Sequence, residues 1–191
     1  QLRESQEDIA RCIMIDARKI RAEALGEVQE AIDMCDFAVG LSRQIYGLTI
    51  ASERPEHKLQ EAYHPIGVIG VITAFNFPCA VWAWNHCLSM VCGNSVVWKG
   101  SPKALNVTAA CKKAWDQAVQ DCMPGGGFED LLQLIDGHKE QAEWMATTLH
   151  RLDRPLAELC PGMGPGMREG RAQAQGGPGA RAGQPPGVLG W

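Results

Sequence analysis

The sequence predicts an α/β protein, in which a Rossmann-like parallel sheet with flanking helices is preceded by N-terminal helices and followed by a disordered tail. Three observations lead to this fold class. Short β-branched apolar runs alternate with helical patterns between residues 66 and 149, an order typical of right-handed parallel crossovers. Helical periodicity fills residues 1–46, and periodicity is lost in a Gly/Pro-rich stretch near the end. We therefore expect a helical segment over 1–57, an α/β domain over 58–151 and a low-complexity tail over 152–191.

Two amphipathic helices are expected in the first segment. The first covers about residues 1–22, and apolar residues recur in it at four-residue spacing, at Ile9, Ile13 and Ala17. Gly26 is expected to break this helix, and a second helix follows over 27–46. Gly47 then supplies a glycine at the usual position of a helix C-cap.

The α/β domain begins with a polar loop and an exposed strand, and its buried strands and helices alternate from there on. Pro78 favours a helix start, because the N–H that proline lacks is not needed in the first turn. Buried strands are distinguished from helices by their shortness and their β-branched residues. The expected elements are a loop over 52–57, strands over 58–63, 66–72, 95–98 and 131–135, and helices over 79–91, from Pro102 to 122, and over 139–149.

Composition narrows the possible classes of function. The chain has 191 residues and a formal net charge of −4 without any basic block, so no nucleic-acid partner is expected, and no apolar stretch is long enough to suggest a membrane span. Its eight cysteines include no Cys-x-x-Cys pair and lie mostly among apolar neighbours, which favours reduced thiols. We expect a cytoplasmic protein, with a mitochondrial one as the open alternative. No metal site is predicted, because the spacing of His86, Cys87 and Cys92 fits no common zinc pattern.

Two polar side chains mark the candidate site. Asn76 follows the strand over 66–72, and Lys99 ends the strand that begins at residue 95. Ligands of open α/β sheets bind at the carboxyl ends of the strands. Each residue also has a simpler interpretation, since asparagine often stabilises turns and a lysine can end a strand in solvent. There is no Gly-x-Gly-x-x-Gly fingerprint, and the glycines within the first strand are more typical of close packing.

The motifs at these strand ends resemble those of the aldehyde dehydrogenase superfamily. Thr-Ala-Phe-Asn-Phe-Pro at 73–78 and Trp-Lys-Gly at 98–100 match its antiquitin-like (aminoadipate semialdehyde dehydrogenase-like) branch, and the resemblance covers only an N-terminal fragment of that family. It implies NAD(P)-dependent oxidation of an aldehyde or semialdehyde to a carboxylic acid, with 58–151 as a partial dinucleotide-binding domain. It also implies a homo-oligomeric full-length parent, in which the strand over 58–63 joins an oligomerisation sheet.

The resemblance also implies roles for individual residues. Asn76 would stabilise the developing oxyanion, Lys99 would contact the adenosine ribose, and Gly137 would lie near the adenine. NAD is the expected cofactor, and NADP stays open because Pro102 stands where many relatives place a ribose-binding glutamate. The backbone expected to lie against the cofactor is that of Ile72, Thr73, Ala74 and Phe75.

The family's nucleophilic cysteine and general-base glutamate have no convincing match. Cys122 and Glu158 only imitate their motifs, so neither is assigned a role. Cys79 lies in the first turn of a helix, where the dipole can lower a thiol pKa, although burial beside tryptophans is the simpler interpretation. We therefore expect the chain to stop before the catalytic cysteine and to be inactive by itself, with a tail open to proteolysis. The alternative is a non-catalytic remnant that acts as a binding or oligomerisation module.

Overall fold

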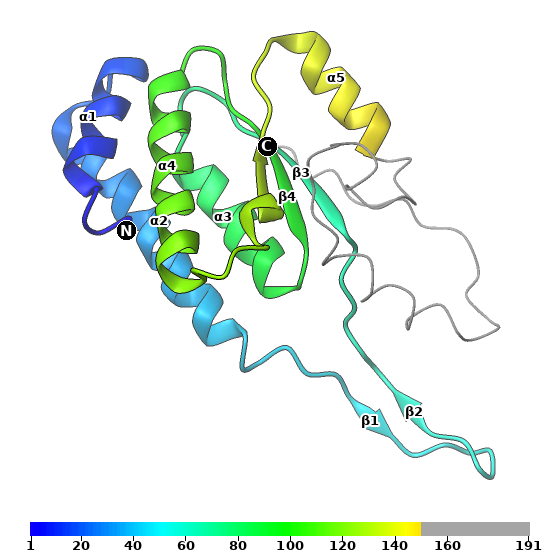
Figure 1. Cartoon of the computed structure of the whole chain (residues 1–191). Helices are drawn as coiled ribbons and strands as arrows, with labels where there is room; N and C mark the ends of the chain where they lie inside the picture. The colour runs from blue at the N-terminus through cyan, green and yellow to red at the C-terminus, as the bar shows by residue number, and fades with distance from the viewer. Residues whose placement is uncertain (150–191) are drawn as a thin grey trace.

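A computed structural model describes residues 1–149 as helices packed around a small sheet (Figure 1). The expected disordered tail over 152–191 and Glu158 lie outside the described residues. In chain order the elements are α1 (Gln6–Asp16), α2 (Arg21–Leu41), β1 (Thr49–Ile50), β2 (Leu59–Gln60), β3 (Val68–Ile72), α3 (Ala80–Val91), β4 (Ser95–Lys99), α4 (Leu105–Cys122), a 3-10 turn (Glu129–Leu131), β5 (Leu132–Leu134) and α5 (Lys139–Thr148). No helix within residues 1–149 is long and apolar enough to cross a bilayer.

The central sheet is parallel, as the alternation of strands and helices predicts. Its strand order is β3-β4-β5, and the register pairs Val68 with Ser95 and Ile72 with Lys99. All of β4 is buried because it lies in the middle of the sheet and is covered on both faces. The α/β fold class with a parallel sheet and flanking helices is thereby confirmed.

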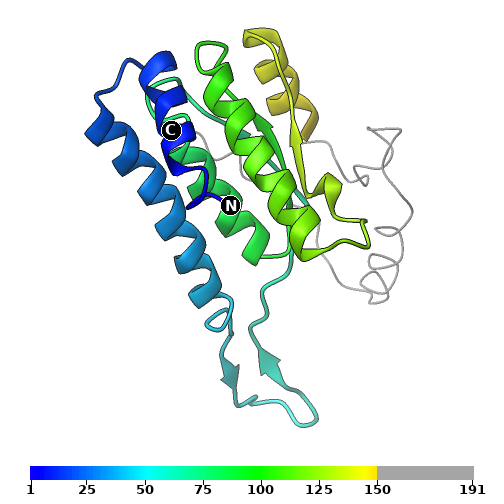
Figure 2. The same ribbon diagram turned by 60° about the vertical axis from the view of Figure 1, so that its left-hand side comes forward.

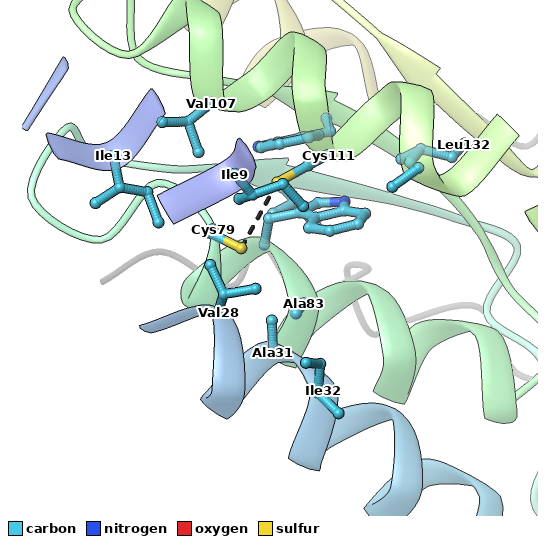
Figure 3. Packing of buried hydrophobic residues seen from close by; sticks show 14 of the residues in the cluster. Ile9, Ile13, Val28, Ala31, Ile32, Cys79, Ala83, Val107, Cys111 and Leu132 are labelled. Carbon is cyan, nitrogen blue, oxygen red and sulfur yellow. Dashed lines mark hydrogen bonds between the residues drawn. The ribbon is translucent and has the colours of Figure 1, made fainter. Parts of the chain in front are cut away.

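Side chains of the strands alternate between two hydrophobic clusters on opposite faces of the sheet. Ile69 and Trp98 join the larger cluster with α1 to α4, whereas Val97 packs with Met145 of α5 on the other face. Figure 3 shows the larger cluster, where side chains from helices far apart in sequence meet. Because period-2 alternation sends neighbouring residues to opposite faces, Val96 and Trp98 of β4 join the larger cluster and Val97 joins the other.

The helix boundaries at the N-terminus differ from the predicted ones. α1 ends at Asp16, and Gly26 lies inside α2 instead of breaking the first helix. The tertiary structure sets the break, because the Asp16 carboxylate accepts hydrogen bonds from Asn106 Nδ2 (2.7 Å) and Val107 N (3.1 Å) at the start of α4. Arg18, with φ of 59°, then turns the chain into α2.

Gly47 is not a helix C-cap either, since α2 already ends at Leu41. It lies beside the antiparallel β1–β2 pair, where a Cβ would stand 2.1 Å from the carbonyl oxygen of Glu61. The two strands form an arm that projects from the helical body (Figures 1 and 2). Only the residues pairing Thr49 with Gln60 and Ile50 with Leu59 are regular, so the exposed strand is shorter than the expected 58–63. Likewise α4 begins at Leu105 and not at Pro102.

The buried imidazole of His86 makes the stability of the fold sensitive to acid. It stacks on Trp82 with ring centroids 5.4 Å apart and meets Trp115 edge-on at 4.3 Å. Neither ring nitrogen has a hydrogen-bond partner within residues 1–149. Burial therefore lowers the pKa of His86 to about 3.

We expect the free energy of unfolding to decrease as the pH falls below about 6.5, because the unfolded chain then binds a proton at His86 that the folded chain does not bind. The slope from this group approaches about 1.4 kcal/mol per pH unit between its unfolded and folded pKa. His86→Phe removes this contribution, and urea denaturation between pH 7 and 4.5 measures it. Equal pH slopes for the two proteins would contradict the prediction.

Candidate functional site

The candidate site lies at the carboxyl edge of the parallel sheet. Ile72 and Lys99 are direct partners across β3 and β4, and the Thr73 N–H donates to the Lys99 carbonyl at 3.1 Å. The structure thus brings the turn that carries Asn76 and the end of β4 to the same edge. β5 ends there too, just before Gly137.

The turn between β3 and α3 has a buried, hydrogen-bonded first residue, and the residues that follow it are exposed. Thr73 is buried, and its Oγ1 accepts a hydrogen bond from Trp98 Nε1 at 3.0 Å. Ala74, Phe75 and Asn76 are exposed. The Asn76 amide forms no hydrogen bond within the part of the chain that the structure describes, so both of its N–H donors remain available to a ligand.

A buried carboxylate holds this turn against α2. Glu27 is 3 % exposed, and its Oε1 accepts hydrogen bonds from the backbone N–H groups of Cys79 (2.8 Å) and Ala80 (3.2 Å) at the start of α3. Its Oε2 pairs with Lys19 Nζ at 2.7 Å. Lys19 Nζ in turn lies 3.6 Å from the ring centroid of Phe77. One carboxylate therefore satisfies a helix N-terminus and anchors the segment that follows Asn76.

Sequence reasoning assigned no role to Glu27. The only signal was a glutamate in helical register with the apolar residues of that helix, with Ala24 three residues before it and Ala31 four residues after it. A carboxylate at a core position implies a buried partner, but its partner is far away in the sequence.

Lys99 is a cation enclosed at the edge of the sheet. It is 4 % exposed, and its Nζ donates to the adjacent Gly100 carbonyl at 3.3 Å. Burial lowers the pKa of Lys99, and the charge of Asp136 partly opposes this shift. Its burial argues against the interpretation of Lys99 as a solvated strand end. An ammonium with donors to spare could bind hydroxyl or phosphate oxygens here.

Gly137 has a structural reason to be glycine. Its φ is 135°, and a Cβ there would stand 2.5 Å from Gln141 Cδ. Gln141 Oε1 accepts the N–H of His138 at 2.8 Å, and the two residues form a capping box at the start of α5. The structure therefore explains Gly137 by the backbone turn alone, and its place near a cofactor stays a prediction.

The cysteines do not supply a nucleophile to this edge. Cys79 is fully buried, its sulfur lies 3.6 Å from that of Cys111, and this contact together with burial raises its pKa well above the ordinary value (Figure 3). Cys122 is exposed, but it ends α4 and so lies toward the opposite edge of the sheet. Within residues 1–149 no three His, Cys, Asp or Glu side chains are grouped so that they could hold a metal ion.

Comparison with protein families gives a match to the model of the "Aldehyde dehydrogenase family" over residues 1–149. The chain is 52% identical over 128 residues to aldehyde dehydrogenase family 7 member A1 of Brassica napus, covering 66% of this chain and 26% of that protein. It is 45% identical over 120 residues to the alpha-aminoadipic semialdehyde dehydrogenase of Bos taurus, covering 63% and 22%. The chain thus spans about a quarter of the length of these relatives.

The fold is also similar to that of solved dehydrogenase structures. Glyceraldehyde-3-phosphate dehydrogenase GapN from Methanocaldococcus jannaschii, complexed with NADP, superposes with a TM-score of 0.66 at 27% identity, covering 73% of this chain and 30% of that one. Lactaldehyde dehydrogenase from Escherichia coli gives a TM-score of 0.66 at 27% identity, covering 73% and 28%.

Proposed function

The chain belongs to the aldehyde dehydrogenase family, and from this premise we propose that residues 1–149 form part of the dinucleotide-binding region of an NAD(P)-dependent aldehyde dehydrogenase. The observation that carries the proposal is the shared sheet edge of Asn76 and Lys99, supported by the match of residues 73–78 and 98–100 to the family motifs. The whole enzyme would oxidise an aldehyde to a carboxylic acid.

The cofactor-binding residues proposed are the backbone of 72–75 and the side chain of Lys99. Ala74 and Phe75 are exposed just after β3, and the enclosed ammonium of Lys99 suits the oxygens of a ribose. These groups fit a dinucleotide, which when bound would supply the hydride acceptor. Lys99 would orient it through the ribose, and we place Gly137 beside it only because β5 ends at the same edge.

The proposed catalytic contribution of this chain is a hydrogen-bond donor. When a nucleophile adds to an aldehyde, negative charge develops on the carbonyl oxygen. The Asn76 amide, which has no partner within residues 1–149, would donate to that oxygen from a turn that Glu27 and Thr73 hold in place. A donor held in place before the reaction needs little reorganisation when the charge appears.

We propose a semialdehyde as the substrate, because relatives at 45% identity bear the name alpha-aminoadipic semialdehyde dehydrogenase. A second candidate function is a non-catalytic module that binds another copy of the chain. One observation favours it, namely the projecting β1–β2 arm, on which Ile50, Leu59 and Tyr63 are exposed. Dinucleotide binding separates the two functions, since only the first requires it.

We expect the chain to bind NAD or NADP and Lys99→Ala to weaken this binding about tenfold or more, because a charge-assisted hydrogen bond contributes roughly 1.5–3 kcal/mol. Isothermal titration of both variants with each dinucleotide measures the effect. Lys113→Ala is the matched control, since Lys113 is an exposed lysine on α4. Equal affinity of wild type and Lys99→Ala, or no binding by either, would contradict the proposal.

A further inference from the structure

Helices α2 and α3 run parallel, and besides their apolar packing they are joined by two polar contacts that share one register. Glu27 Oε1 accepts the N–H of Cys79, and the sulfurs of Cys35 and Cys87 lie 3.6 Å apart, so each contact joins residues that are 52 apart in the sequence. Eight residues of helix rise about 12 Å. The thiol pair therefore forms a second contact between the same helices, about 12 Å from the one that anchors the Asn76 turn (Figure 2 shows the two helices side by side).

Both thiols are reachable from solvent. Cys35 and Cys87 are partly exposed and line a cavity of about 380 Å³ between α2, α3, α4 and the first residues of the chain. The walls of this cavity are mainly apolar, with Trp82, Trp115 and Ile32 among the lining residues. A small neutral oxidant can enter a space of this kind.

The two thiols differ in reactivity. The hydrogen bond from Cys87 lowers the pKa of Cys35 to about 7, although burial and the charge of Asp36 oppose the shift. The same contact and burial raise the pKa of Cys87. Cys35 is thus partly thiolate near neutral pH, and Cys87 holds its proton. Cys35 therefore suits the role of the attacking cysteine, which must be a thiolate, and Cys87 suits the role of the resolving cysteine.

We propose that Cys35 and Cys87 form a peroxide-sensitive pair that closes to a disulfide linking α2 and α3. Cys35 ionises by releasing its proton to solvent. Its thiolate attacks one oxygen of hydrogen peroxide, the O–O bond breaks, and Cys35 sulfenic acid and hydroxide form. The hydroxide takes up a proton from solvent and becomes the first water. The Cys87 sulfur then attacks the Cys35 sulfur, the S–O bond breaks, and the leaving oxygen takes the Cys87 proton as a second water. Two thiols lose two electrons, and the peroxide is reduced to two molecules of water.

To form the disulfide, the sulfurs must approach from 3.6 Å to about 2.05 Å, by rotation of the two partly exposed side chains. The Cys79–Cys111 pair provides an internal comparison, because its sulfurs are also 3.6 Å apart. Both of these cysteines are fully buried, and the pKa of Cys79 is raised. The two pairs have the same sulfur–sulfur distance but differ in solvent exposure and in thiol pKa. We therefore expect the two pairs to be oxidised at different rates.

The test treats the reduced 191-residue chain with hydrogen peroxide at pH 7.4, blocks remaining thiols with N-ethylmaleimide, and maps the peptides of the monomer without reduction. We expect a Cys35–Cys87 linked peptide that forms at least about tenfold faster than a Cys79–Cys111 link. Cys35→Ser and Cys87→Ser each abolish it, and in Cys87→Ser dimedone traps sulfenic acid on Cys35. Circular dichroism checks that each variant folds, and the wild-type map decides the question if one does not.

Two results would overturn the proposal. In the first, Cys35 is still found modified by N-ethylmaleimide, and so unoxidised, after the exposed Cys92 and Cys122 have been oxidised. In the second, the buried Cys79–Cys111 pair links as fast as Cys35–Cys87. A Cys35–Cys87 link found only between chains, in dimers, would also overturn it, since the geometry places the two sulfurs within one molecule.

Discussion

Asn76→Ala, made in a full-length relative that carries the same motif, is expected to lower kcat by about 10²-fold or more and to leave the dinucleotide Kd unchanged. The Asn76 amide is exposed at the turn after β3 and makes no hydrogen bond within residues 1–149, so its removal costs the fold little. The donor would act only on the charge that develops during the reaction, and its loss therefore appears in kcat. Steady-state kinetics with single-turnover measurements test this.

Asn76→Asp is the matched variant for this experiment. It keeps the size of the side chain but replaces the amide donor by a carboxylate that repels an oxyanion, so we expect a loss at least as large as with alanine. Lys99→Ala should show the opposite profile, with a weakened dinucleotide and a smaller change in kcat at saturation. An unchanged kcat for Asn76→Ala, with chemistry shown to be rate-limiting, would reduce Asn76 to a turn residue.

Glu27→Ala is expected to lower the free energy of unfolding by about 3–5 kcal/mol. The substitution leaves the Lys19 ammonium without its carboxylate and the N–H groups of Cys79 and Ala80 without their acceptor. The ion pair is largely buried, so the charge left behind is poorly solvated. Urea denaturation followed by circular dichroism measures the loss.

Two further variants separate the causes of that loss. Glu27→Gln keeps an oxygen acceptor for the α3 N-terminus but lacks the charge, so it should destabilise less than alanine. Glu23→Ala is the control, since Glu23 is exposed in the first turn of the same helix and should cost at most about 1 kcal/mol. A Glu27→Ala variant as stable as Glu23→Ala would show that the buried contact contributes nothing net.

The sequence by itself determined the class of fold and the elements of the sheet. The short apolar runs over 66–72, 95–98 and 131–135 became β3, β4 and β5, and the proline at 78 preceded α3 as expected. These predictions succeeded because burial on both faces of a strand leaves a continuous apolar pattern that local sequence displays. The same reasoning placed Asn76 and Lys99 at one edge, since parallel strands share the direction of their carboxyl ends.

Only the tertiary structure decided where the first helix ends and what supports the site. Asp16 ends α1 through bonds to Asn106 and Val107, about 90 residues further on. Glu27 holds a helix that begins more than fifty residues later. A carboxylate at a helix position carries no sign of its partner until folding brings the partner close, whereas the repeat of apolar residues is present in the chain before it folds.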